Sequence, residues 1–156
     1  MLADFFHWLQ ATTVANTVAN SLPLLGGLSA VHLLAFALLM GSILVSSLRM
    51  TGLLFSDRPV SDITSGTNRG VAVGLCLSVV TGLLLFSSRA SSAAENGIFQ
   101  IKMLLLVAAA VFHFGVSRVV TRRAGASTGR LRATGATALV LWLGVALAGC
   151  AFIFLE

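Results

Sequence analysis

The chain has 156 residues, of which 57% are hydrophobic and only 10% are charged. Soluble domains carry about 25% charged residues, so this composition excludes an ordinary soluble protein and predicts an integral membrane protein. The net charge of +5 fits the membrane topology derived below, and we expect no nucleic-acid partner.

The first 21 residues are too polar to span a membrane. Leu2, Phe5, Phe6 and Leu9 recur at helical spacing, with polar residues between them. Amphipathic helices of this kind lie in the membrane–water interface, where tryptophan is also enriched. We therefore expect residues 1–21 to form a surface helix, with Trp8 at the level of the lipid headgroups.

Four apolar segments follow, at residues 24–48, 70–87, 98–120 and 133–155. A membrane-spanning helix needs about 17 to 25 mostly apolar residues, so each segment is long enough to cross. Backbone polar groups inside a bilayer must be paired within the protein, and helices achieve this. The sequence predicts an all-α fold over residues 1–156, a single membrane domain built as a four-helix bundle with an N-terminal amphipathic surface helix.

The second apolar segment carries small residues at every fourth position. Because such a stripe follows one helix face, it lets a neighbouring backbone approach closely. We therefore expect tight helix packing along Gly70, Gly74, Ser78 and Gly82.

The arginines predict the topology. Eight of the ten basic residues lie in or beside two linkers, between the first and second spans and between the third and fourth. The positive-inside rule places both linkers on the cytoplasmic side of a bacterial inner membrane and both termini on the outer side. The eight residues are Arg49, Arg58, Arg69, Arg118, Arg122, Arg123, Arg130 and Arg132.

Three ionisable residues lie within the spans: His32, Lys102 and His113. Such residues usually face the bundle interior or a cavity and are candidates for function. Lys102 and His113 are eleven residues apart, about three helical turns, and so share one face. A lysine near the outer surface suits an anionic group such as a haem propionate, and Arg89 could serve a second one. The alternative is that Lys102 extends to the outer interface.

His32 and His113 are candidate haem ligands, because neutral imidazole binds haem iron well. The alternative for each is a histidine hydrogen-bonded to a neighbouring carbonyl. The predicted depths of the two side chains differ by about 13 Å at 1.5 Å per residue. The two ligands of one haem must lie at nearly the same depth, so this offset needs an explanation. Either there are two sites at two depths, or only one histidine binds, or the span boundaries are shifted. His7 or Met103 are the candidates to complete an outer metal site with His32.

The spans contain no carboxylate except Glu156 at the end of the chain. This argues against a hydrolase and against carboxylate-driven proton transport, and nothing indicates a transferase. Whether the chain is part of an enzyme stays open, with an electron-transfer subunit of an oxidoreductase as the candidate.

Several stretches resemble an uncharacterised bacterial family of small four-span membrane proteins. They are WLQAT (8–12), VHLLAFALLMGSILVSSLRMTGLL (31–54), VVTGLLLF (79–86) and IFQIKMLLLVAAAVFH (98–113). The pattern includes His32, Lys102 and His113, and the chain departs from it at Ser47, where an acidic residue is expected. The family is distantly similar to copper-resistance-type and cytochrome-b-type four-helix membrane proteins, which implies haem or copper by analogy.

The residues and the resemblance together favour a haem-b-binding electron-transfer protein. It would be a membrane subunit in a complex or oligomer that passes electrons from a periplasmic redox partner to quinone, with His32, His113, Lys102 and Arg89 at the cofactor. One alternative is a copper- or small-solute-handling protein that uses the same histidines with Met103. Another is a structural or assembly subunit without a cofactor.

Overall fold

The computed structural model describes residues 2–122 and 126–155, and within them it is almost entirely helical, with no strand. Three long helices are α3 (Leu22–Thr51), α4 (Val60–Ser87) and α8 (Thr128–Leu155). A fourth rod consists of α6 (Gly97–Val111), the π-helical turn η1 (Phe112–Ser117) and α7 (Arg118–Arg122). These four rods are each long and apolar enough to cross a membrane. The expected all-α, four-span membrane protein is confirmed.

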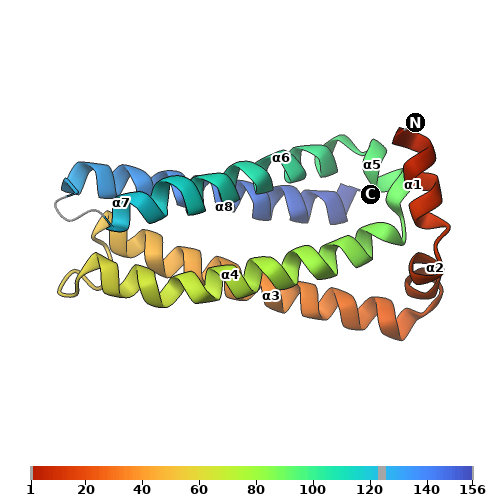
Figure 1. Ribbon diagram of the computed structural model, residues 1–156, viewed down its shortest axis with the longest axis horizontal. Coiled ribbons are helices and arrows are strands. Elements are labelled where there is room, and N and C mark those ends of the chain that lie inside the picture. Colours follow the sequence, from red (N-terminus) through yellow and green to blue (C-terminus); the bar gives the residue numbers. More distant parts are fainter. Residues whose placement is uncertain (1, 123–125, 156) are drawn as a thin grey trace.

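The four rods run side by side along the long axis of the molecule (Figure 1). Three short helices, α1 (Leu2–Gln10), α2 (Thr13–Asn20) and α5 (Ala90–Glu95), lie at one end of the bundle, where α8 also ends. We call this the cap end. The opposite end carries the linker 52–59, the end of α7 and the start of α8, and we call it the loop end.

The N-terminal segment differs from the single surface helix expected over residues 1–21. It forms two helices, because the chain breaks at Ala11 and Thr12 and the Thr12 hydroxyl accepts a hydrogen bond from the Ala15 backbone nitrogen at 3.3 Å. A threonine in this position starts a new helix by satisfying one of its free N–H groups. Trp8 is exposed while Ala15 and Val18 are buried, so the segment is amphipathic as predicted.

The helix α4 begins at Val60, well before the predicted start of the second span at residue 70. The Thr64 and Thr67 hydroxyls donate to the carbonyl oxygens of Val60 and Ile63 at 2.9 and 3.0 Å. Asp62 stands in the first turn, where a negative charge favours the helix dipole. The polar stretch before residue 70 is therefore the first turns of the helix, outside its most apolar part.

The small-residue stripe of α4 packs against α3, as predicted. An added Cβ at Gly74 would lie 2.7 Å from the Leu39 backbone nitrogen and 2.9 Å from the Ala35 carbonyl oxygen. Gly135 of α8 packs in the same way on α3, where its Cβ would lie 2.8 Å from the Ser47 carbonyl oxygen. Because these contacts involve backbone atoms, only glycine fits without moving a helix.

The middle of the bundle is held by a small apolar core around Trp142. Its buried members come from all four rods, and they are Leu39, Ile43, Val71, Ala109, Trp142 and Val145. Outside this core most large apolar side chains are exposed on the helix surfaces. Such a surface suits lipid rather than water, and the chain is a multi-pass membrane protein.

Candidate functional site

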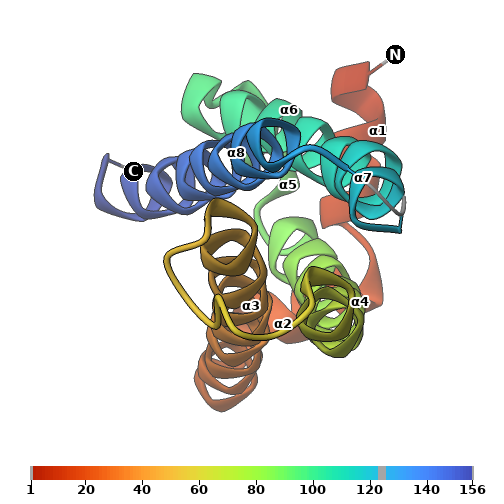
Figure 2. The same cartoon turned by 90° about the vertical axis from the view of Figure 1, so that its left-hand side faces the viewer.

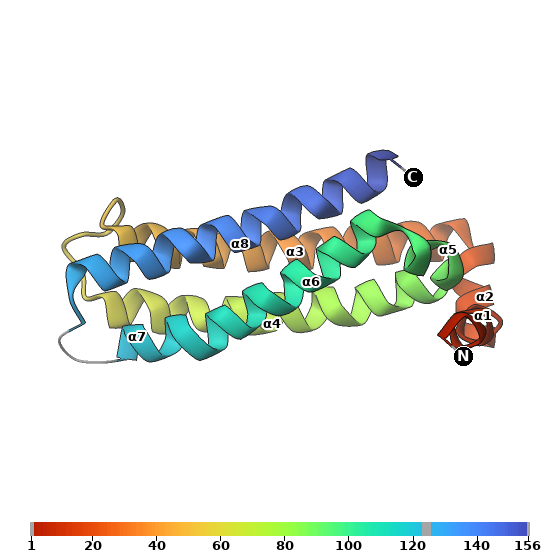
Figure 3. The ribbon, with the colours of Figure 1, turned by 90° about the horizontal axis from the view of Figure 1, so that it is seen from above.

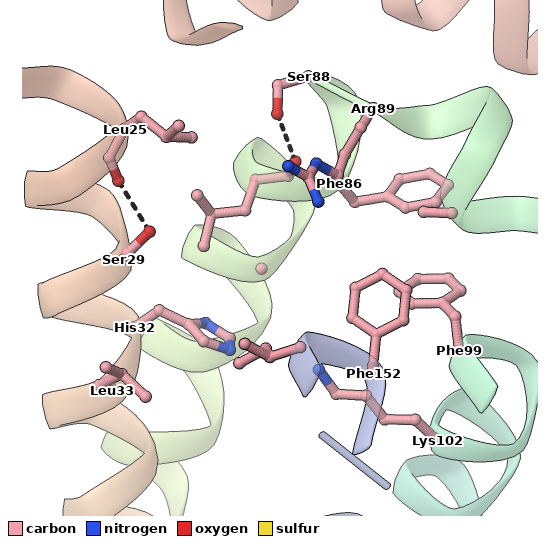
Figure 4. Close-up of a pocket in the computed structure, with 14 residues that line it drawn as sticks. Leu25, Ser29, His32, Leu33, Phe86, Ser88, Arg89, Phe99, Lys102 and Phe152 are labelled. Atoms are coloured by element: carbon pink, nitrogen blue, oxygen red, sulfur yellow. Dashed lines mark hydrogen bonds between the residues drawn. The ribbon is translucent and has the colours of Figure 1, made fainter. Parts of the chain in front are cut away.

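A cavity of about 450 Å³ lies inside the cap end of the bundle, between α3, α4, α5, α6 and α8. Its polar side chains come from three segments, which are α3, the turn between α4 and α5, and α6, and most of the remaining lining is apolar (Figure 4). The volume falls within the range of about 300–1,000 Å³ that is usual for small-molecule sites. The polar lining residues are Ser29, His32, Ser88, Arg89 and Lys102.

His32 points from α3 toward α4, and its Nδ1 lies 2.9 Å from the Thr81 hydroxyl oxygen. That hydroxyl also lies 2.6 Å from the Leu77 carbonyl oxygen, which can only accept. A hydroxyl has one proton, so Thr81 donates it to Leu77 and accepts from the N–H at Nδ1 of His32. This arrangement assigns the neutral imidazole its proton at Nδ1 and leaves a lone pair at Nε2.

Gly82 makes room for the His32 ring. An added Cβ at this position would lie 3.1 Å from Cε1 and 3.6 Å from Nδ1 of the imidazole. The Nδ1–Cε1 edge of the ring therefore rests on α4, at Thr81 and Gly82. Gly82 therefore helps to orient the His32 side chain, in addition to letting α3 and α4 pack closely.

Two cations line the same cavity as His32. The Lys102 side chain extends from α6 along α8, where an added Cβ at Gly149 would meet its Cε at 3.6 Å. Arg89 follows the last residues of α4 and lies above the cavity, while His32 and Lys102 face it from opposite walls (Figure 4). Of the described residues that line the cavity, none is acidic. The charged side chains that the described lining contributes are thus Lys102 and Arg89.

An aromatic wall closes one side of the cavity. The rings of Phe86 and Phe99 are stacked with their centroids 5.1 Å apart, and Phe152 follows Phe99 at 5.5 Å. Phe6 of α1 packs edge-on against Phe86 at 5.9 Å. The surface helix α1 is thus joined to this aromatic wall.

The structure does not bring His113 to this cavity. The side chain is 4% exposed, lies in the π-helical turn η1 next to α7, and packs edge-on against Phe114. The cavity therefore unites His32, Lys102 and Arg89 without His113. The cofactor roles of all four residues stay predictions.

His7 and Met103 also lie away from the cavity lining. His7 is exposed on α1, and Met103 is 38% exposed on the surface of α6. Neither lines the cavity with His32. Within residues 2–122 and 126–155, no group of three His, Cys, Asp or Glu side chains is placed to hold a metal ion.

The sequence did not identify Thr81 or the aromatic wall as parts of the site. Thr81 is 49 residues from His32, and an isolated threonine in an apolar run carries no sequence signal. The glycine spacing of α4 did predict a close neighbour at Gly82, although not that the neighbour is an imidazole.

The fold and the cavity define a class: a four-span helical membrane protein with an imidazole and two cations in a cavity at one end. The chain belongs to a family of unknown function, DUF6644, whose family model matches residues 5–155. This match confirms the expected membership of an uncharacterised family and extends it over the fourth span. It carries no link to copper-resistance or cytochrome b proteins. No curated protein and no solved structure matches the chain.

Proposed function

We propose that the cavity at the cap end binds haem b, with His32 as the iron ligand, and that the protein transfers electrons in the membrane. One observation carries the proposal. The Nδ1 proton of His32 is committed to Thr81, so the Nε2 lone pair is available in a cavity that also holds Lys102 and Arg89. Histidines that bind metals typically donate their other ring N–H to a fixed acceptor in this way.

The two cations support a ligand with two carboxylates. Lys102 and Arg89 both lie on the cavity lining. Charge-assisted hydrogen bonds from such groups to carboxylates are roughly twice as strong as neutral ones. In the proposed role, Lys102 and Arg89 hold the propionates and orient the flat apolar body between His32 and the aromatic wall of Phe86, Phe99 and Phe152.

The lining supports ligation by one histidine rather than two. His32 is the one imidazole among the described lining residues, and no methionine or cysteine accompanies it. His113, His7 and Met103 lie elsewhere. We therefore narrow the expected ligand set to His32, with Lys102 and Arg89 at the propionates, and give His113 a separate role. The chemistry that haem supplies when bound is one-electron exchange at iron.

The distribution of arginines supports a cap end on the outer side of a bacterial inner membrane. Arg49 and Arg58 lie at the loop end, where the Arg49 side chain donates to the Arg58 carbonyl oxygen at 2.9 Å. Arg130 and Arg132 begin α8 at the same end. The positive-inside rule then places the cavity toward the periplasm. In this orientation the protein would accept electrons from a periplasmic redox partner, within an oligomer or a larger complex, and deliver them to quinone.

The test is the reduced-minus-oxidised spectrum of the protein purified in mild detergent from haem-replete cells. We expect b-type bands in the wild type and in His113→Ala, and their loss in His32→Ala. We also expect Lys102→Gln to retain less haem than Lys102→Arg, because arginine keeps the charge. A featureless wild-type spectrum, or loss of the bands in His113→Ala alone, would reject the proposal. A featureless spectrum would favour the subunit without a cofactor.

A further inference from the structure

One side of the cavity opens toward lipid, between α3 and α8. Leu33 of α3 and Ile153 of α8 both line the cavity, yet 60% and 69% of their surfaces are exposed. A residue that lines a cavity and is also exposed stands at its mouth. We call the opening between Leu33 and Ile153 the lateral portal.

The portal arises from the way α3 and α8 diverge. The two helices touch closely toward the loop end, where Gly135 meets the Ser47 carbonyl oxygen. From there α8 moves away from α3 toward the cap end (Figures 2 and 3). The separation leaves the cavity uncovered on this side, in a part of the bundle that belongs to the membrane spans.

The cap helices cover part of the end of the cavity that faces the water. Ala93 of α5 lines the cavity there. The helix α1 packs against α5 and α4 at this end (Figure 1). It is held by the packing of Phe6 on Phe86 and by the Gln10 side-chain oxygen, which accepts from the Ser91 backbone nitrogen at 3.1 Å. The cap helices therefore cover only part of the end that faces the water, where the exposed Arg89 lies at the edge of the cavity, whereas the side between Leu33 and Ile153 is open toward lipid.

We propose that the cavity exchanges its ligand with the lipid leaflet at the cap end, through the lateral portal. The ligand class follows from the chemistry of the route and of the cavity. The portal side chains are apolar, whereas Lys102 inside the cavity favours an anion. The ligand is therefore an amphipathic anion that partitions into membranes. Haem is one member of this class, and to that extent the inference rests on the proposed function.

The test blocks the portal and compares it with a matched change on the same two helices. The portal variant is Leu33→Trp with Ile153→Trp. The control is Leu34→Trp with Leu147→Trp, since these residues are 71% and 69% exposed but do not line the cavity. Each protein, prepared without haem, is reconstituted into phosphatidylcholine vesicles, and thermal unfolding followed by circular dichroism verifies that both variants fold.

Two probes are supplied from donor vesicles: haem, followed by its Soret absorbance, and cis-parinaric acid, a fluorescent long-chain carboxylate. We expect the portal variant to load both probes at least about tenfold more slowly than the wild type, because mutational changes in association rate can span one to three decades. The control should match the wild type. Lys102→Gln should weaken binding of the fatty acid.

The outcomes separate this inference from the proposed function. If the wild type takes up the fatty acid but not haem, the haem proposal is rejected, and the loading rate of the fatty acid still tests the portal. Equal loading of the wild type and the portal variant would overturn the inference, as would equal slowing by the control. Failure of the wild type to take up either probe would overturn it as well.

Discussion

The most informative residue is His32, because its surroundings fix which ring nitrogen can act. Thr81 accepts from Nδ1 only because its own proton goes to the Leu77 carbonyl oxygen, at 2.6 Å. Through these two hydrogen bonds, the Leu77 carbonyl oxygen on α4 determines which tautomer His32 adopts on α3. A hydrogen-bonded histidine and a ligand histidine, which the sequence offered as alternatives, are compatible here because each uses a different nitrogen.

Thr81→Val tests this role of the threonine with little change in shape. Loss of the hydroxyl removes the acceptor for Nδ1, so the imidazole should populate both tautomers, and haem affinity should fall about 10- to 100-fold, as is usual when such a partner is lost. The first effect is measurable without haem, by ¹⁵N NMR of labelled histidine. Thr81→Ser, which keeps the hydroxyl, is the control.

If Thr81→Val kept a single tautomer with the proton at Nδ1, another acceptor would hold His32 and the assignment would be wrong. An unchanged haem affinity with a mixed tautomer would instead separate the hydrogen bond from ligand binding.

At the scale of the elements, the close contact of α3 and α4 positions the site. His32 lies on α3 and Thr81 lies on α4. The distance between the two helices is set by glycines of α4 that contact the backbone of α3. At Gly74 an added Cβ would lie 2.7 Å from the Leu39 backbone nitrogen. Backbone atoms cannot yield as a flexible side chain can, so the helices would have to separate.

We therefore expect Gly74→Ala to lower the free energy of unfolding by about 1–3 kcal/mol, the usual cost of overpacking, and to weaken ligand binding at His32 as well. Gly66→Ala on the same helix is the matched control, because an added Cβ there meets no atom within 4 Å. It should be neutral or stabilising by up to about 1 kcal/mol. Unfolding in detergent by a denaturant series measures both, and equal stability of the two variants would contradict the packing argument.

The elements also show which parts of the fold the sequence can predict. The four spans follow from hydropathy, because a bilayer demands long apolar helices whatever their partners. The helix α4 begins before the apolar segment, because Thr64 and Thr67 satisfy their hydroxyls on backbone carbonyls and so fit in a helix, which hydropathy does not register. The π-helical turn at His113 has no known sequence signal, and it changes which face that histidine presents.

At the scale of the whole molecule, the two ends of the bundle differ in kind. The cap end holds the cavity, its two cations, the aromatic wall and the short helices α1, α2 and α5. The loop end holds most of the arginines and the close crossing of α3 and α8. The sequence predicted this charge asymmetry and the individual residues His32, Lys102 and Arg89. It also grouped these three residues with His113 at one cofactor. It could not predict that the cavity leaves His113 out, because that depends on contacts between residues far apart in the chain.

The most direct test of the central claim is rescue of haem binding in His32→Gly by free imidazole. If His32 is the iron ligand, the purified variant should lack b-type bands and regain them, with a bound haem, when imidazole replaces the missing side chain. His113→Gly should keep its bands without imidazole. Full haem retention in His32→Gly, or a loss that imidazole does not restore in the folded protein, would contradict ligation by His32.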